Sequence, residues 1–445
     1  MSVAKQDSRP VLMFVAPYFP PAYYGGVIQV YLSLLSRLER YRVVVVADEH
    51  GCGHGEMVSW DRLAPIDHCL SVERIEAFEF HLPETASQQG HQAGWTQLSR
   101  SRELARFIVR GYDQFDELIK RVKPTIIVCG GTYSAGWLME MVVGTDPLIN
   151  YLHGEELTMR VSPKFLMPFM RFLQMRSIRK ARLNIAVSAY TAGLVETLAH
   201  AKVSRTALLP NFVDTSRFRI TGRRAAVRTQ LGWEDKLILL TLARLERRKG
   251  IDHALHALAL LSSERRLPAN WSYVIAGCGR EYEKLVDLSN QLGLAQRVSF
   301  VGFVPNERVV DMYEAADIFL QPNREVDGDT EGFGIVFLEA AACGLPVIGG
   351  TAGGTADAIA EGINGYRVNG DSIDEIATAI ERLAGDAELR ERMSVQGAAM
   401  VAQNFTVEQA AKRFEQLLDR VYEECYAKSR MAHAGSGANT SLMDC

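Results

Sequence analysis

Short apolar runs alternate along the chain with longer stretches of helical periodicity. The first half of the chain contains apolar runs at residues 11–16, 43–47, 125–129, 148–152 and 183–187. The second half contains further runs at residues 237–242, 272–276, 297–301, 318–321 and 346–348. Several of them are continuously apolar, as expected of strands that are buried on both faces of a parallel sheet. The pattern predicts an α/β protein with two doubly wound parallel sheets of five strands each.

The apolar pattern breaks between residues 209 and 225, where Pro210-Asn211 is followed by basic residues. We therefore expect an N-terminal domain over 1–208 and a C-terminal domain over 209–405. A last helix is predicted from about 406 to 425, because Thr406 and Gln409 form a capping box at its start.

Two segments lack the alternating pattern. Residues 428–445 are small and polar, and we expect a disordered tail there. Residues 50–94 are rich in loop-forming residues and long for a connection. This stretch is expected to cover a cleft or to be poorly ordered.

The composition fits a soluble protein of two or three domains in 445 residues. With 49 basic and 53 acidic residues the net charge is −4, which argues against a dedicated nucleic-acid binder. The 7 cysteines are scattered without a C-x-x-C pair, as is typical of reduced thiols in the cytosol. Residues 1–10 do not resemble a signal peptide, and no apolar run reaches the roughly 18 residues of a membrane span. We expect a cytoplasmic protein that is soluble or attached at most to a membrane surface.

Ligands of open α/β sheets bind at the carboxyl ends of the strands, so residues that follow the apolar runs are candidates for a site. Gly25 and Gly26 follow the first run and precede a helical stretch, where free amides can bind an anion. A tight turn that requires glycine is the alternative. His153 follows the 148–152 run. At the end of a strand it is expected to face a cleft, and the alternative is a hydrogen-bonded structural histidine.

Two cations follow the 237–242 run. Arg244 lies at the tip of the expected strand and Lys249 at the start of the next helix. Together they could clamp a diphosphate, with the arginine bidentate. The alternative is a solvated basic loop.

The segment 327–348 carries the richest combination of residues. Gly332 and Gly334 open a helix whose first amides can hold a phosphate. Glu331 and Glu339 are separated by about 12 Å along this helix, too far for an acid/base pair at one bond. The spacing suits two ends of an extended ligand. An exposed surface pair is the alternative, but the helix is otherwise apolar, and an unpaired buried carboxylate is costly.

Other patterns allow weaker interpretations. Asp327-Gly-Asp329 resembles a metal-diphosphate motif, and His50-Gly-Cys52-Gly-His54 resembles a set of metal ligands, but plain loops are favoured for both. We therefore expect no metal site. Residues 160–182 contain seven basic residues, no acid and interleaved apolar residues. This stretch could lie on an anionic membrane or cover its own sheet.

Taken together, these segments resemble the retaining glycosyltransferases of family 4, which have the GT-B fold. The resemblance runs from residue 11 to about 422, and E-x7-E with its glycines, followed by Cys-Gly344-Leu-Pro346, is its most specific part. Within this family, the motifs most resemble those of bacterial mannosyl- and hexosyltransferases that act on lipid or saccharide acceptors. Phe212 is a departure, because the family often has glycine at this position and phenylalanine adopts a positive φ only at a cost.

The resemblance implies two Rossmann-like domains that face a cleft, with the acceptor on the first domain, the donor on the second and the last helix crossing back. The implied catalytic residues are His153, Glu331, Arg244 and Lys249. The two cations would stabilise the departing diphosphate, Glu331 would bind the donor sugar, and His153 would contact the sugar or the reaction centre. The implied donor-binding residues are Gly25, Gly26, Gly302, Phe303, Val304, Phe333, Gly334, Ile335 and Glu339. Of these, 302–304 would lie against the base and Glu339 would bind the ribose.

The implied reaction is retaining transfer of a hexose from a UDP- or GDP-linked donor by front-side attack, without a metal or a further cofactor. The implied acceptor is a lipid-linked or saccharide molecule of cell-envelope or polysaccharide biosynthesis, such as lipopolysaccharide. Peripheral contact with the inner face of the plasma membrane stays open. The alternatives are a soluble sugar-phosphate acceptor, epimerisation of a nucleotide sugar, or a non-catalytic sugar-binding protein. No G-x-G-x-x-G follows the first run and no P-loop occurs, which argues against a dehydrogenase.

Overall fold

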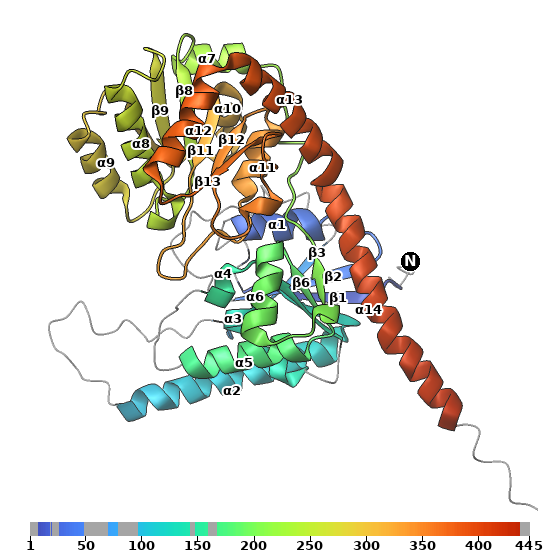
Figure 1. Ribbon diagram of the computed structural model, residues 1–445. Helices are drawn as coiled ribbons and strands as arrows, with labels where there is room; N and C mark the ends of the chain where they lie inside the picture. Colours follow the sequence, from blue (N-terminus) through green and yellow to red (C-terminus); the bar gives the residue numbers. More distant parts are fainter. Residues whose placement is uncertain are drawn as a thin grey trace, which may run out of the picture.

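The computed structural model describes residues 8–17, 19, 26–48, 70–78, 97–142, 147–158 and 167–436. They form two lobes, each built on one parallel sheet (Figure 1). The N-terminal lobe holds a 7-stranded sheet in the order β3-β2-β1-β4-β5-β6-β7. Its strands are β1 (Val11–Val15), β2 (Arg42–Asp48), β3 (Leu70–Ile75), β4 (Ile126–Cys129), β5 (Leu148–Leu152), β6 (Leu183–Ala186) and β7 (Thr206–Leu208).

The C-terminal lobe holds a 6-stranded sheet in the order β10-β9-β8-β11-β12-β13. Its strands are β8 (Leu237–Leu242), β9 (Trp271–Ala276), β10 (Val298–Gly302), β11 (Ile318–Gln321), β12 (Val347–Gly350) and β13 (Gly365–Val368). In both sheets the strand order reverses beside the first strand of the lobe, between β1 and β4 and between β8 and β11. Such switch points open a crevice at the carboxyl ends of the strands.

Helices cover the sheets of both lobes. The N-terminal lobe contains α1 (Gly26–Leu35), α2 (Gln97–Val122), α3 (Thr132–Ala135), η2 (Leu138–Met141), α4 (Glu155–Thr158), α5 (Met167–Lys180), α6 (Ala189–Ala199) and η3 (Val203–Arg205). The C-terminal lobe contains α7 (Arg224–Leu231), η4 (Arg247–Lys249), α8 (Ile251–Ser263), α9 (Tyr282–Gln291), η5 (Asn306–Arg308), α10 (Val309–Ala315), α11 (Ile335–Ala342), η6 (Thr355–Asp357), α12 (Ile373–Gly385) and α13 (Ala387–Asn404). Capping side chains fix several starts: Ser188, for example, accepts from the amide of Thr191 at the start of α6.

Alternation along the central strands divides the core between the two faces of each sheet. In β4, Ile126 and Val128 belong to one apolar cluster, while Ile127 and Cys129 belong to another on the opposite face. All four side chains are fully buried. Both faces of this strand are therefore covered, which explains why its sequence is continuously apolar.

The chain crosses between the lobes twice. The first crossing follows β7, and the second precedes the last helix, α14 (Val407–Ser436). The crossings lie together, because the amide of Val213 donates to the carbonyl of Phe405 at 2.9 Å and Val213 forms a parallel bridge with Thr406.

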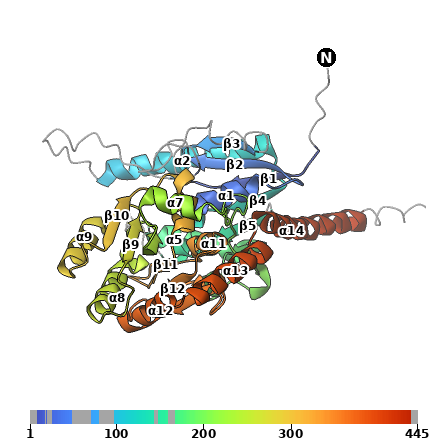
Figure 2. The same ribbon diagram turned by 90° about the horizontal axis from the view of Figure 1, so that it is seen from above.

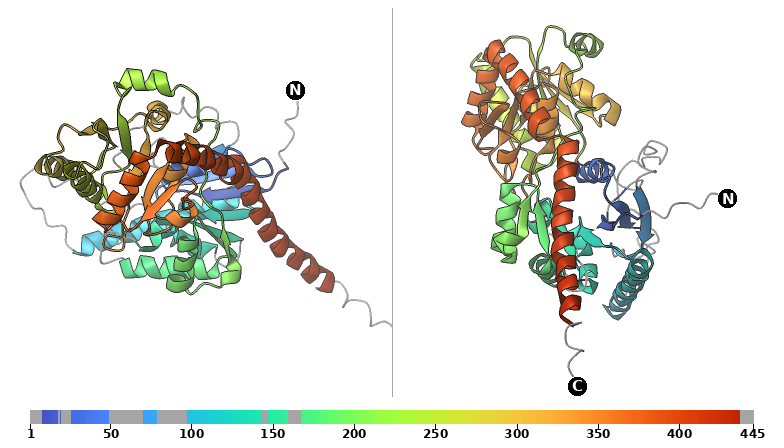
Figure 3. Two further views of the ribbon diagram at one scale, coloured as in Figure 1. Left: turned by 45° about the horizontal axis from the view of Figure 1, so that its top comes forward. Right: turned by 90° about the vertical axis from the view of Figure 1, so that its right-hand side faces the viewer.

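Helix α14 returns to the N-terminal lobe and runs along it, beside α1 (Figures 1 and 3). The Glu415 carboxylate accepts hydrogen bonds from the amides of Glu39 and Arg40, both at 2.9 Å. Tyr41 donates to Asp419 at 2.8 Å. Seen from above, the far end of α14 extends beyond both sheets (Figure 2).

The structure corrects the expected strand count. The sheets have 7 and 6 strands instead of five each, because β3, β7 and β13 were not predicted. Strand β3 lies within 50–94, the stretch expected to be loop-rich, and pairs in parallel with β2. It alternates apolar and polar residues at the edge of its sheet, so it lacks the continuous apolar run of the central strands.

The structure also extends the last helix to Ser436, although a disordered tail was expected from residue 428. Residues such as Lys428, Arg430, Met431 and Ala432 favour helix, and no proline ends it. Over the part of the chain that is described, no helix combines the length and the apolar character needed to cross a bilayer.

Candidate active site between the lobes

The two lobes touch at the carboxyl ends of their strands. The loop after β5 presents the carbonyl of His153, and a Cβ added to Gly332 of the other lobe would lie 2.0 Å from that oxygen. The Ser188 hydroxyl donates to the Gly332 carbonyl at 2.8 Å, and the Ala189 amide donates to Asp357 at 2.9 Å. Residues 153–154 therefore abut residues 331–332, with no side chain between their backbones.

A buried ion-pair cluster lies beside this contact. Lys249 and Arg248, on the η4 turn after β8, bind the same Glu331 oxygen at 2.6 and 3.1 Å. The three side chains are 9%, 6% and 14% exposed. Burial opposes ionisation of Glu331, but the charges of Lys249 and Arg248 overcome it and lower the pKa of this carboxyl to about 2. Burial lowers the pKa of Lys249, and the charge of Glu331 opposes this effect.

Arg248 is the residue of this cluster that the sequence analysis missed. Its guanidinium also lies 3.2 Å from Asp329, 3.6 Å from Glu246 and 3.8 Å from Glu155 of the opposite lobe. The predicted Arg244 instead lies at the rim of the site, 60% exposed and 3.4 Å from Glu246. The signal available in the sequence was a second cation directly before Lys249.

The ion pair with Arg248 also accounts for the Asp327-Gly-Asp329 motif. Asp329 faces the guanidinium, while Asp327 lies in a tight turn with φ of 55°. Within the described residues, no cluster of three or more His, Cys, Asp or Glu side chains could hold a metal ion. The His50–His54 motif lies outside the described residues.

His153 is buried with an unsatisfied ring nitrogen. Its ring packs between Tyr31 and Tyr151, with centroids 5.3 and 5.1 Å away. Burial lowers the pKa of His153 to about 3, so the imidazole is neutral near pH 7. Its Nε2 has no hydrogen-bond partner within the described residues, and a buried polar atom of this kind usually has one. A hydroxyl of a bound ligand would supply that partner.

The loop and helix after β11 hold both glutamates of the E-x7-E motif. Gly334 has a φ of 87° and caps α11 at its N-terminus, next to Ile335. The Phe333 side chain is buried in the core, so only its amide can serve a ligand. Glu339 is partly buried and accepts a hydrogen bond from the Tyr313 hydroxyl at 2.9 Å. The two glutamates are therefore not an exposed surface pair.

The remaining donor-binding candidates lie at other strand and helix ends. Gly302 ends β10 with a φ of 68°. It is followed by Phe303, whose side chain is 60% exposed, and by the partly buried Val304. An exposed aromatic ring at a strand end offers a surface on which a base can stack. Gly26 begins α1, and within the described residues no atom lies within 4 Å of a Cβ added to it; Gly25 lies outside the described residues.

The expected basic helix is α5, preceded by undescribed residues 159–166. Phe169 and Phe172 are 54% and 55% exposed on it. Two of its arginines have structural partners: Arg171 donates to the carbonyl of Glu156, and Arg176 pairs with Glu140 at 2.6 Å. The stretch thus serves the lobe's own packing and still leaves an apolar pair exposed.

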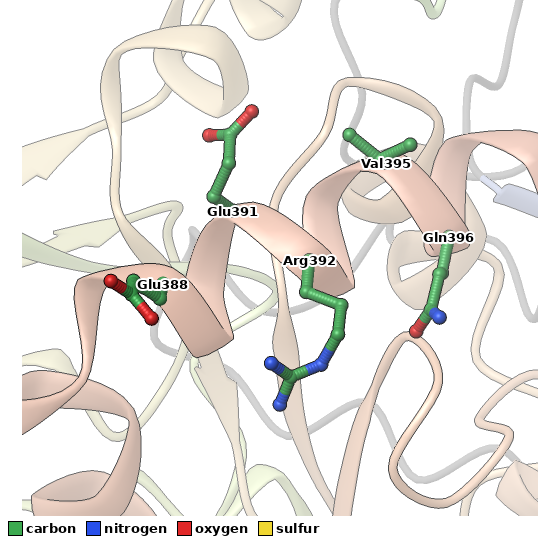
Figure 4. Close-up of a pocket in the computed structure, with 5 residues that line it drawn as sticks. All are labelled: Glu388, Glu391, Arg392, Val395 and Gln396. Atoms are coloured by element: carbon green, nitrogen blue, oxygen red, sulfur yellow. The ribbon is translucent and has the colours of Figure 1, made fainter.

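A separate surface depression lies on α13 of the C-terminal lobe (Figure 4). It is lined by Glu388, Glu391, Arg392, Val395 and Gln396. None of these residues belongs to the strand-end site. The depression is therefore distinct from the contact between the lobes.

Two family descriptions match the chain in succession. Residues 24–217 match Glycosyltransferase Family 4, and residues 223–400 match Glycosyl transferases group 1. Together they span both lobes.

Curated relatives match over part of their length. A GDP-mannose-dependent alpha-(1-6)-phosphatidylinositol monomannoside mannosyltransferase of Mycolicibacterium smegmatis is 36% identical over 213 residues, covering 47% of this chain and 55% of the relative. A D-inositol 3-phosphate glycosyltransferase of Nocardia farcinica is 32% identical over 232 residues, covering 51% and 50%. The matched region thus spans about half the length of these relatives.

Solved structures share the fold over nearly the whole chain. A sucrose-phosphate synthase from Thermosynechococcus elongatus superposes with a TM-score of 0.72 at 20% identity, covering 94% of this chain and 100% of that chain. The Anabaena HepE protein in complex with UDP has a TM-score of 0.68 at 19% identity, covering 92% and 100%. These similarities establish the two-lobed arrangement of Rossmann-like sheets.

Proposed function

Because the chain belongs to the family 4 glycosyltransferases with the GT-B fold, we propose that it transfers a hexose from a UDP- or GDP-linked donor to a lipid-linked or saccharide acceptor. The proposed reaction retains the anomeric configuration and needs no metal ion. The donor binds the C-terminal lobe and the acceptor binds mainly the N-terminal lobe. The reaction centre lies where His153 faces Glu331 and Gly332.

The buried cluster of Lys249, Arg248 and Glu331 is the observation that carries this proposal. Departure of a nucleoside diphosphate develops negative charge, which fixed cations in a site shielded from water stabilise strongly. In the described structure the Glu331 carboxylate forms an ion pair with the Lys249 ammonium group at 2.6 Å. An incoming diphosphate would compete for this cation and release Glu331 to bind hydroxyls of the donor sugar. Arg244, exposed at the rim, would contact the diphosphate from the solvent side.

The cations also support a metal-independent reaction. A magnesium ion commonly neutralises the diphosphate in nucleotide-dependent transfer, and lysine and arginine can supply the same positive charge. The amides at the start of α11, beginning with Ile335, add a positive dipole end. A neutral His153 would orient a sugar hydroxyl without adding charge at the reaction centre.

Relatives support a lipid acceptor without identifying it. The Mycolicibacterium smegmatis relative acts, by its description, on a phosphatidylinositol monomannoside. An acceptor of this kind lies in a membrane, and Phe169 and Phe172 on α5 give this chain an exposed apolar pair for insertion into the headgroup region. We place the enzyme in the cytoplasm, in peripheral contact with the inner face of the membrane.

The donor site is tested by thermal stabilisation with UDP, GDP and ADP and their sugar conjugates, with magnesium or with EDTA. A nucleotide at 100 times its dissociation constant adds about 2.7 kcal/mol of stability. We expect one diphosphate to stabilise the wild-type chain equally in both conditions. The Lys249→Ala variant should lose this response. Lys284→Ala, which changes a lysine 71% exposed on the same lobe, is the matched control and should keep it.

Two results would contradict the proposal. A response that requires magnesium would exclude the metal-independent clamp. No response to any nucleotide would exclude the donor site itself. The product's anomeric configuration, read by NMR from a synthetic acceptor, tests retention separately.

A soluble acceptor is the second candidate, because the Nocardia farcinica relative is described as acting on D-inositol 3-phosphate. The two candidates differ in their need for a membrane. Sedimentation with vesicles of phosphatidylglycerol and phosphatidylcholine, compared between wild type and Phe169→Ser/Phe172→Ser, separates them. Binding that the double variant loses supports the lipid acceptor, whereas no binding by the wild type supports the soluble one.

A further inference from the structure

Tyr313 is a buried residue that contacts Glu339 of the E-x7-E motif. The sequence analysis did not select it, because it lies outside the motifs that resemble the family. It lies on α10, and its side chain is completely buried. Its ring is held by Phe218 and Phe319, with centroids 6.2 and 5.8 Å away. The packing leaves the hydroxyl little freedom, and it donates to Oε2 of Glu339 at 2.9 Å.

We propose that Tyr313 is a positioning residue that orients the Glu339 carboxylate toward the ribose hydroxyls of the nucleotide donor. One carboxylate oxygen is held by the phenol, and the other is left to accept from the ribose. This inference rests on the proposed function, in which Glu339 binds the ribose. Tyr313 itself does not touch the ligand.

The chemistry of the pair suits a fixed acceptor. Burial, followed by the charge of Glu339, raises the pKa of Tyr313 far above its usual value, so the phenol keeps its proton and always donates. Burial raises the pKa of Glu339, while the Tyr313 hydrogen bond and the charge of Arg217 lower it. The Cys343 thiol also interacts electrostatically with this carboxylate, and burial, followed by the charge of Glu339, raises its pKa so that it stays neutral. Burial prevails, so the pKa of Glu339 is raised, and the phenol and Arg217 limit this rise.

The test compares ribose and 2′,3′-dideoxyribose forms of UDP, GDP and ADP by calorimetry on the full chain. The wild type should prefer the ribose form of the diphosphate that it binds. Tyr313→Phe keeps the ring and removes the hydroxyl. It should bind the ribose form about tenfold more weakly, the loss expected for a hydrogen bond to a charged group, and should bind the dideoxy form as the wild type does.

Tyr273→Phe is the matched control. Tyr273 is equally buried in the same lobe, but its hydroxyl bonds Thr241 at 2.6 Å, away from both glutamates. This variant should keep the ribose preference. Glu339→Asp tests the ribose contact itself, because the shortened side chain retracts the carboxylate from both the phenol and the ribose. It should lose the ribose preference even if Tyr313→Phe fails to fold.

A pH series adds a measurement that a purely structural role would not change. Without the phenol, the pKa of Glu339 rises further and its carboxylate is lost at a higher pH. As the pH is lowered, the affinity of Tyr313→Phe for the ribose form should therefore begin to fall at a higher pH than that of the wild type. An equal loss for ribose and dideoxy forms, or no loss, would overturn this inference and leave the donor site standing. Failure of the wild type to bind any nucleotide would overturn both.

Discussion

At the scale of single residues, Glu331 is charged in the interior because two cations share one of its oxygens. Its pKa is about 2 in the folded protein, below the ordinary value of 4.5. The carboxylate therefore contributes stability fully above pH 4.5 and loses it as the pH falls toward 2. Removing one member of a buried ion pair also leaves the other charges uncompensated.

We expect Glu331→Gln to lower the free energy of unfolding by about 3 kcal/mol at pH 7. The difference from wild type should shrink as the pH falls below 4.5. Urea unfolding at pH 7, 5 and 3.5 measures both effects. Glu307→Gln, an exposed carboxylate of the same lobe, is the control and should change little. A constant difference at all three pH values would contradict the ion-pair explanation.

His153 should behave as a neutral residue over the physiological range. Its pKa is about 3 when folded against 6.5 ordinarily, so its contribution to stability is present above pH 6.5 and is lost as the pH falls toward 3. Ring-labelled NMR should show no titration of this histidine above pH 5, whereas the urea-unfolded chain should titrate near pH 6.5. A folded-state pKa near 6.5 would show that the ring is exposed to solvent.

The sequence pattern selected some residues of the candidate site and missed another. Lys249 and His153 were singled out because they lie at the start of a predicted helix and just after a predicted strand, and the two glutamates because of their spacing on an otherwise apolar helix. Arg248 was not, because a run of three cations gives no sign of which one turns inward. That choice depends on Asp329 and on Glu155 of the other lobe, which are brought to Arg248 only by the fold.

At the scale of elements, α14 is a structural part of the lobe to which it returns. Phe414 is fully buried, and its ring stacks 6.0 Å from that of Tyr151, which in turn contacts His153. We expect Phe414→Ala to destabilise the N-terminal lobe by about 3–5 kcal/mol. Hydrogen exchange resolved by lobe should show faster exchange in β5 but not in β8. Glu424→Ala, exposed on the same helix, is the control, and equal exchange in both lobes would contradict this assignment.

Sequence pattern identified central strands better than edge strands. Strands such as β5, β8 and β11 are mostly apolar and buried on both faces, and they were predicted with their observed bounds. Strands β3 and β13 lie at sheet edges, where one side or one end meets solvent and the apolar run is interrupted. Strand β7 has only 3 residues, none of them buried, so no pattern could mark it.

At the scale of the whole molecule, Gly332 sets how closely the lobes approach. Its Cα faces the His153 carbonyl so closely that a methyl group would lie 2.0 Å from it. Gly332→Ala should therefore hold the lobes apart while leaving each lobe folded. The radius of gyration from small-angle scattering should increase, and nucleotide-sugar affinity should fall by about tenfold, equivalent to 1.4 kcal/mol.

Gly193→Ala is the control for this variant. Gly193 lies in α6, where no atom of the described residues comes within 4 Å of an added Cβ, and alanine favours helix there. It should stabilise the protein slightly and leave the scattering unchanged. An unchanged radius of gyration for Gly332→Ala would mean that the contact at His153 does not limit closure.

The paired crossings have a consequence for how the protein can be divided. Since α14 belongs to the N-terminal lobe but follows the C-terminal lobe in the chain, the core of the first lobe is completed only after α14 has been synthesised. A protease that cuts once between residues 214 and 223 would produce two fragments that stay associated, because the second fragment still carries the helix that completes the first. An independent N-terminal lobe would have to be expressed with α14 attached through a linker.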